Sequence, residues 1–141
     1  MLLGSPTKYG AGITLAGDHI DLVDLHEMIH HFAAESGPIP PLHGEFLLGL
    51  AYDVRHAYQG DRRTRRVETF KGKCTYFAVD ILWPIFLVQV AMLRSAASYL
   101  PTGKSQQANL YRLEACAENA LNDLDADISC ECCRWLAEFA Q

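Results

Sequence analysis

The chain has 141 residues, half of them apolar, and a formal net charge of -5. This length and apolar content can supply one buried core, so we expect a single domain over residues 1–141. The acidic balance argues against a general nucleic-acid binder, which needs a cationic surface to displace phosphate counterions. The N-terminus lacks the basic start and apolar run of a secretion signal, which favours a cytoplasmic location.

The first third of the chain predicts a strand followed by a helix. Residues 12–17 alternate apolar and small side chains between two glycines, the pattern of a short strand. Asp18 and Asp21 are N-cap candidates for the helix, which should stop at residues 36–38, Ser-Gly-Pro. Its core-facing stripe consists of Leu22, Leu25, Ile29 and Phe32. Prolines within residues 38–41 predict an extended connection.

A second helix and a hairpin are predicted next. The helix should end near Gly60, and its apolar stripe consists of Phe46, Leu50, Val54 and Ala57. A basic loop follows at residues 61–66. Residues 67–70 and 74–79 then read as two strands joined around Lys71-Gly72, which gives a small antiparallel sheet of two or three strands.

The last 60 residues predict helices. The stretch from Ile81 to Leu100 is apolar on nearly all sides, and Pro84 is tolerated because first-turn amides have no helical partner. A further stripe runs from Leu110 to Phe139, with Ser105 as N-cap and a break near residues 125–127, where acidic residues compete for helical hydrogen bonds. The expected fold is therefore α+β and helix-dominated, with about five helices and the small sheet.

The apolar surface of the predicted helices also indicates which partners the protein has. The apolar run from Ile81 to Leu93 is too short to span a membrane, which needs ~20 residues. Together with the stripe from Leu110 to Phe139, it offers more apolar surface than a small sheet can cover. Because large apolar patches usually mark partner sites, we expect a homodimer. The leading functional expectation is a cytoplasmic interaction or regulatory domain that acts as a homo-oligomer.

The alternative is a zinc-dependent hydrolase that uses the segment His26-Glu27-Met28-Ile29-His30. Two histidines four residues apart on one helix can bind zinc, and the adjacent glutamate can act as general base. Asp24 departs from the usual pattern, because zincins favour an uncharged residue there. Ser36 stands where a longer form of the motif has a third histidine.

A catalytic zinc also needs a third protein ligand. Spacing singles out no residue for this position, and His56 is the most attractive candidate, since it follows Asp53 by three residues on the second helix. The other candidates are His43, Glu45, Asp53 and Glu68. Helix geometry places His26 roughly 80° and His30 roughly 120° from the core direction, with Glu27 nearly opposite the core.

The basic loop and the predicted hairpin segment that follows it contain half of the positive residues. Six of the twelve Lys and Arg residues lie between Asp61 and Lys73, and the arginines of the loop are Arg62, Arg63, Arg65 and Arg66. They could grip phosphates, with aromatic residues nearby to stack on bases. A charged loop is ordinarily solvated, however, or pairs with acidic residues of another subunit. Nucleic acid is therefore not the expected partner.

The five cysteines and one polar cluster indicate a function less clearly than the zinc-type motif or the basic loop. The cysteines lack the spacing of a disulfide scaffold, so reduced thiols are expected, and Cys132 shares an apolar stripe, which favours a core role over metal binding. Tyr52, Asp53 and Arg55 gather polar and aromatic side chains that suit an interface, a pocket or helix ends.

Four segments carry a resemblance to known proteins. They are residues 24–30 (DLHEMIH), 50–60 (LAYDVRHAYQG), 83–93 (WPIFLVQVAML) and 107–114 (QANLYRLE). Together they resemble short bacterial proteins of a family whose function is unknown. The resemblance spans most of the chain, and it implies no activity and no site residues.

Overall fold

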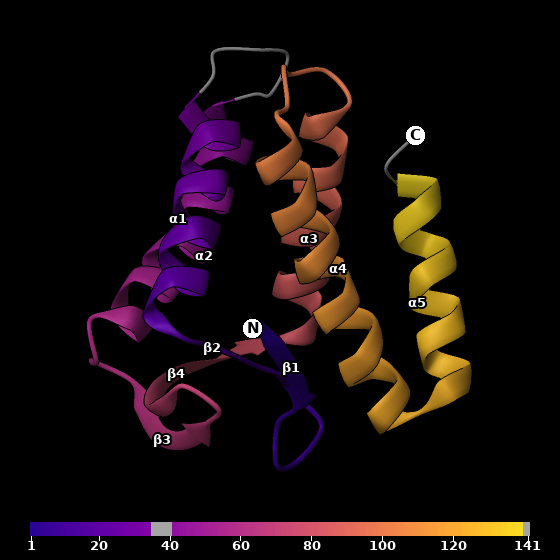
Figure 1. The fold of residues 1–141 in the computed structure, drawn as a ribbon. Helices are drawn as coiled ribbons and strands as arrows, with labels where there is room; N and C mark the ends of the chain where they lie inside the picture. Colours follow the sequence, from indigo (N-terminus) through magenta and orange to yellow (C-terminus); the bar gives the residue numbers. More distant parts are fainter. Residues whose placement is uncertain (35–40, 140–141) are drawn as a thin grey trace.

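The computed structural model describes residues 1–34 and 41–139. Helices stand on one face of an antiparallel sheet, and the last helix flanks two others (Figure 1). The elements are β1 (Leu3–Pro6), β2 (Gly12–Gly17), α1 (His19–Ala34), α2 (Pro41–Tyr58), β3 (Arg63–Thr69), β4 (Gly72–Leu82), α3 (Trp83–Ala97), α4 (Lys104–Leu124) and α5 (Ala126–Phe139). The expected helix-dominated α+β class is confirmed.

The sheet has four strands in the order β1-β2-β4-β3, so the expected two or three strands were too few. The strand that the sequence does not reveal is β1, which pairs with β2 from Leu3 opposite Ala16 to Pro6 opposite Ile13. Its sequence, Leu-Gly-Ser-Pro, contains two poor strand formers. Proline is nevertheless tolerated at a sheet edge, because an edge strand has one side without ladder partners.

Both hairpin strands are longer than predicted. The strand β3 begins at Arg63, so most of the predicted basic loop is strand, and β4 continues to Leu82, past the predicted helix start at Ile81. Val79 and Ile81 are buried while Asp80 and Leu82 are exposed, which is the alternation of a strand with one covered face. Pairing with β2 holds this segment extended despite its apolar run.

The helix ends follow local chemistry in most cases. The Asp18 carboxylate accepts a hydrogen bond from the Asp21 N–H at 2.8 Å, as the N-cap prediction requires. Gly60 adopts a φ of 85° after α2. The predicted break is confirmed at Asp125, whose extended backbone separates α4 from α5 and whose carboxylate accepts hydrogen bonds from the next helix. The Ser105 prediction is wrong, because α4 begins at Lys104.

Three further predictions concern the same segments. Residues 36–38, the predicted stop of the first helix, lie outside the described residues, as do residues 38–40 of the predicted connection. Pro41 belongs to α2 rather than to a connection, since it is the first residue of that helix. No helix within residues 1–34 and 41–139 has the length and apolarity needed to cross a bilayer.

One contiguous core joins the sheet to the helices. Ile13 and Leu15 of β2 are fully buried under the helices, as are Phe32 of α1 and Phe86 of α3. The helix α4 crosses β1 closely at Gly4, where an added Cβ would lie 2.5 Å from the backbone oxygen of Cys116. A glycine at this crossing therefore sets the distance between the sheet and α4.

We predict that Gly4→Ala lowers the free energy of unfolding by roughly 2–3 kcal/mol, because the crowded atoms are backbone and must shift together. The matched control is Gly49→Ala, where a Cβ meets nothing closer than the Gln89 amide at 3.7 Å. Alanine there should stabilise α2 by roughly 0.5–1 kcal/mol. Urea denaturation measures both. Equal effects of the two substitutions would contradict the close crossing.

Candidate functional site

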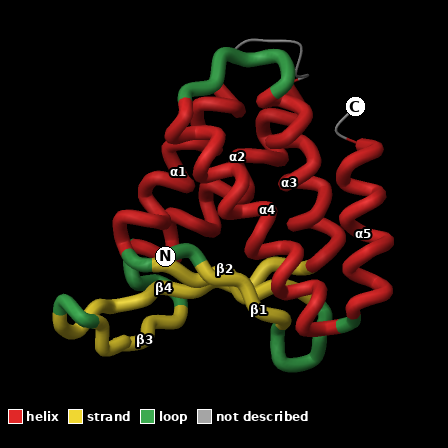
Figure 2. The backbone as a smooth tube through the Cα atoms, turned by 45° about the vertical axis from the view of Figure 1, so that its right-hand side comes forward, coloured by secondary structure: helices red, strands yellow, loops and turns green. Residues whose placement is uncertain are grey.

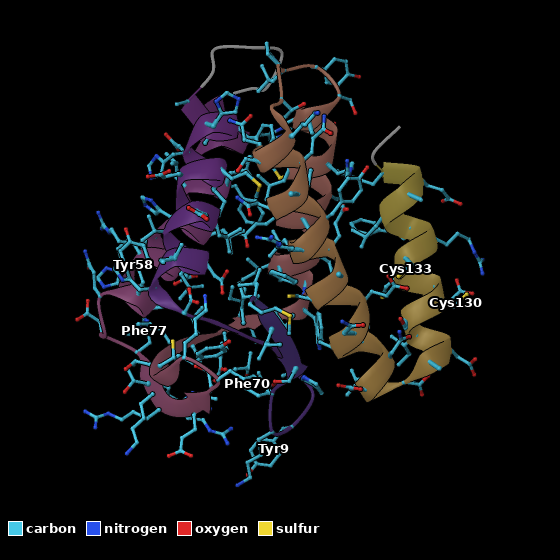
Figure 3. All side chains as sticks on the ribbon, in the orientation of Figure 1. Tyr9, Tyr58, Phe70, Phe77, Cys130 and Cys133 are labelled. Atoms are coloured by element: carbon cyan, nitrogen blue, oxygen red, sulfur yellow. The ribbon has the colours of Figure 1, made fainter. Side chains whose placement is uncertain are left out.

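The helix α1 brings two histidines together on its outer side. The ring centroids of His26 and His30 are 4.4 Å apart, one helical turn from each other. Tyr58, the last residue of α2, presents its ring to His26 at 5.8 Å and to His19 at 5.3 Å. Figure 3 labels Tyr58 near Phe77 of β4, and His19 contacts both rings. The result is a half-exposed aromatic cluster where α1, α2 and the sheet meet.

The environment of His26 favours its neutral form. Partial burial lowers the pKa of this imidazole below its ordinary value of 6.5, and the neighbouring His30 and Arg55 lower it further. The carboxylate of Glu27 acts in the opposite direction as a smaller effect. Zinc binds neutral imidazole, so His26 is held in the form that a metal ligand needs.

The third member of the predicted zinc site lies in different surroundings. The His56 Nδ1 is 2.7 Å from the carboxylate of Asp61, and its ring contacts Tyr52. Asp53, the expected orienting residue, is instead 3.7 Å from Arg62, and burial raises the pKa of its carboxyl. Within residues 1–34 and 41–139, no three His, Cys, Asp or Glu side chains are grouped to hold a metal ion.

The predicted general base, Glu27, is exposed, as helix geometry indicates. The structure therefore supplies two of the three nitrogen or oxygen ligands that a catalytic zinc requires, together with a carboxylate that faces away from the core. Two ligands and an exposed carboxylate do not complete a catalytic zinc site. What α1 provides is a pair of imidazoles in the spacing of a two-ligand metal site.

We predict a pH effect that belongs to His26. Because its pKa in the folded protein is below 6.5, the unfolded chain takes up this proton first as the pH falls. The free energy of unfolding should therefore decrease from pH 7.5 to 5.5, and part of that decrease should be missing in His26→Gln. NMR titration of the imidazoles gives a direct check. A His26 midpoint at or above 6.5 would contradict the burial argument.

The basic segment is the second candidate site. Two of its arginines are paired: Arg63 with Asp80 across the hairpin, and Arg62 with Asp53 of α2. The remaining cations of the hairpin form no ion pair within the described residues, and they are Arg65, Arg66, Lys71 and Lys73. Figure 3 labels Phe70 at the free end of this hairpin, and its side chain is fully exposed.

A third feature lies between α3, α4 and α5, where a cavity of about 370 Å³ is lined mainly by apolar side chains. Arg94 of α3 and Glu114 of α4 form a two-pronged ion pair at its wall, with N–O distances of 2.7 and 2.5 Å. The Tyr111 ring lies 4.8 Å from the guanidinium. No spacing pattern in the sequence links these three residues, because they lie on two different helices.

The outer side of α5 is apolar and uncovered. Ile128, Trp135 and Phe139 are 49, 40 and 46 % exposed, and the Trp135 and Phe139 rings are 5.3 Å apart. The neighbouring side of the helix carries Cys133 and Leu136, which line the cavity. Thus α5 covers only part of its apolar surface, and the stripe of Ile128, Trp135 and Phe139 remains exposed.

The five cysteines form no disulfide in the described residues. Cys116 is buried under β1, and burial raises the pKa of its thiol to about 11, with Asp21 adding to the effect. Cys132 packs against the core, as its place in an apolar stripe predicts. Figure 3 shows Cys130 and Cys133 on α5. In the part of the chain that the structure describes, none of these thiols belongs to a group of three or more side chains that could hold a metal ion.

The fold and these surfaces define a two-layer α+β domain with helices on one face of its sheet and a basic hairpin at one corner. Residues 2–135 match the model of a family described as a domain of unknown function, DUF6904. The chain belongs to this family, which confirms the resemblance to a family whose function is unknown. Comparisons with curated proteins and with solved structures each returned no match.

Proposed function

We propose that the protein is a cytoplasmic interaction domain that self-associates through α5. The observation that carries this proposal is the apolar stripe of Ile128, Trp135 and Phe139 on the outer side of that helix. Residues at i, i+7 and i+11 span an arc of roughly 40° around a helix, so the three side chains form one continuous surface. Such a surface is the usual mark of a partner site.

The energetics favour covering this stripe. Each of the three side chains is about half exposed, so burial by a partner would contribute roughly 1 kcal/mol apiece. Tryptophan is also enriched among the residues that dominate binding energy. The Trp135 and Phe139 rings already contact each other, so little side-chain freedom is lost when a partner packs on them.

A second copy of the same chain fits the stripe best. Ile128 and Trp135 lie on either side of Cys132 at similar spacing, so two antiparallel α5 helices would place apolar side chains against apolar side chains. Two-fold dimers are the commonest oligomers. Charge repulsion does not oppose the approach of two α5 helices at the centre of this interface. Glu131 and Arg134 are paired with each other at 2.9 Å within one helix.

We predict that the wild-type protein sediments as a dimer at micromolar concentration and that Trp135→Asp sediments as a monomer. A buried aspartate without a partner would cost several kcal/mol at the centre of the interface. Ile128→Asp provides an independent substitution in the same stripe and should have the same effect. Sedimentation equilibrium measures all three species, and circular dichroism verifies that the variants remain folded.

The matched control is Ile20→Asp, which changes an apolar side chain that is 69 % exposed on α1. An acidic residue is well tolerated in the first turn of a helix, so this variant should remain dimeric. A monomeric wild-type protein would refute the proposal. Equal dissociation of the α1 and α5 variants would assign the effect to added charge rather than to the stripe.

A second candidate function is zinc-dependent hydrolysis with His26 and His30 as ligands and Glu27 as base. The observation in its favour is the close pairing of the two imidazoles, one of which is held neutral. Its third ligand is not found among the described residues, so it ranks below self-association.

We predict for this candidate that the purified protein binds zinc and that the double substitution His26→Ala, His30→Ala abolishes binding. Isothermal titration with zinc measures the stoichiometry and the affinity. His43→Ala, which removes an exposed histidine of α2, is the control and should bind like the wild type. If the wild-type protein takes up no zinc after supplementation, the hydrolase has no metal and is excluded.

A further inference from the structure

The β3–β4 hairpin extends beyond the body of the protein as a two-stranded ribbon. The pairing of β4 with β2 ends at Phe77, which lies opposite Gly17. From Arg65, opposite Tyr76, to Thr69, opposite Gly72, the sheet consists of β3 and β4 alone. Figure 2 shows this part of the sheet reaching out to one side, away from the helices.

The ribbon carries cations on both of its faces. Side chains alternate between faces along a strand, so Arg65 lies on the face away from the helices and Arg66 on the opposite one. Lys73 shares the face of Arg66, because it lies opposite Glu68, and Lys71 lies in the turn. All four cations are exposed, and Glu68 is the only carboxylate on the ribbon.

The tip of the ribbon is apolar. Phe70 and Lys71 form a two-residue turn between Thr69 and Gly72, and Gly72 has a φ of 112°, which favours glycine. The Phe70 ring is fully exposed, so its burial contributes nothing to the stability of the fold. An aromatic ring in this position is available to a ligand.

We propose that this ribbon binds in a groove of duplex DNA. The major groove admits a two-stranded ribbon, and a groove has phosphates on both walls. Cations on both ribbon faces match two walls, whereas a flat membrane surface would meet one face only. An apolar tip can contact thymine methyl groups on the groove floor. The corresponding groove of duplex RNA is too deep and narrow to be read in this way.

The distribution of charge supports the same partner. Half of the positive residues lie between Asp61 and Lys73, so the rest of the chain is strongly acidic. Phosphates repel that body and attract the ribbon, which orients the protein as it approaches. This inference does not depend on the self-association through α5, since the ribbon and α5 share no residues.

The test is binding of a fluorescent 20-base-pair DNA duplex, followed by anisotropy between 50 and 200 mM salt. Up to four phosphate contacts predict a slope of log affinity against log salt of about -3 to -4. The double substitution Arg65→Ala, Arg66→Ala should weaken binding roughly tenfold and reduce the slope by about 2. Phe70→Ser should weaken binding and leave the slope unchanged, because it removes no charge.

The control is Lys8→Ala, Lys104→Ala, which removes the same charge from exposed positions outside the hairpin and should bind like the wild type. Equal losses in the two double variants would overturn the proposal, because the effect would then reflect net charge alone. Absence of duplex binding, or equal binding to duplex RNA, would also overturn it. So would binding to vesicles rich in phosphatidylserine without binding to DNA.

Failure of the α5 proposal remains distinguishable from failure of this one. The Trp135→Asp variant retains the whole ribbon, so it should bind the duplex with the salt slope of a single ribbon, about -3 to -4, whether or not the wild type is a dimer. A dimer would only add affinity through its second ribbon. Loss of duplex binding in a folded Trp135→Asp variant would contradict the assignment of the site to the hairpin.

Discussion

The pairing of β4 with β2 is the interaction on which the rest of the structure depends. Six residue pairs, from Gly12 opposite Leu82 to Gly17 opposite Phe77, attach one half of β4 to the centre of the sheet. The inward side chains of that half complete the core beneath the helices. The other half pairs only with β3 and forms the projecting ribbon. Because α3 begins at the residue after β4, the same pairing also fixes where that helix starts.

The helices could be predicted because their signals are local. An amphipathic stripe, the Asp18 cap and the break at Asp125 each depend on residues within a few positions of one another. The strands depend on partners far away in the sequence. The short β1 is a strand because β2 lies beside it, and the arginines of β3 are extended because each lies opposite a residue of β4. Neither partner can be read from the segment itself.

The same distinction applies to the candidate sites. The approach of His26 and His30 follows from their spacing of four on one helix, and it was predictable. The contact of His56 with Asp61 and the ion pair of Arg94 with Glu114 depend on turns and on helix packing. The structure changes the interpretation of the basic segment more than that of any other candidate site. In a loop its arginines would be solvated charges, but in a strand they have fixed faces and can be matched to the shape of a ligand.

Protection of a sheet edge offers a simpler account of some of these charges. Charged residues on an edge strand prevent pairing with other chains, and β3 is an edge strand. That account covers Arg65 and Arg66, and it also covers Lys73, because β4 has no second neighbour in the ribbon. It does not extend to Lys71, which lies in the turn. It also fails for Phe70, since a fully exposed aromatic ring promotes association rather than preventing it. A cationic ribbon with an apolar tip is better explained by a polyanion with an accessible apolar surface between its charges, and a DNA groove has both.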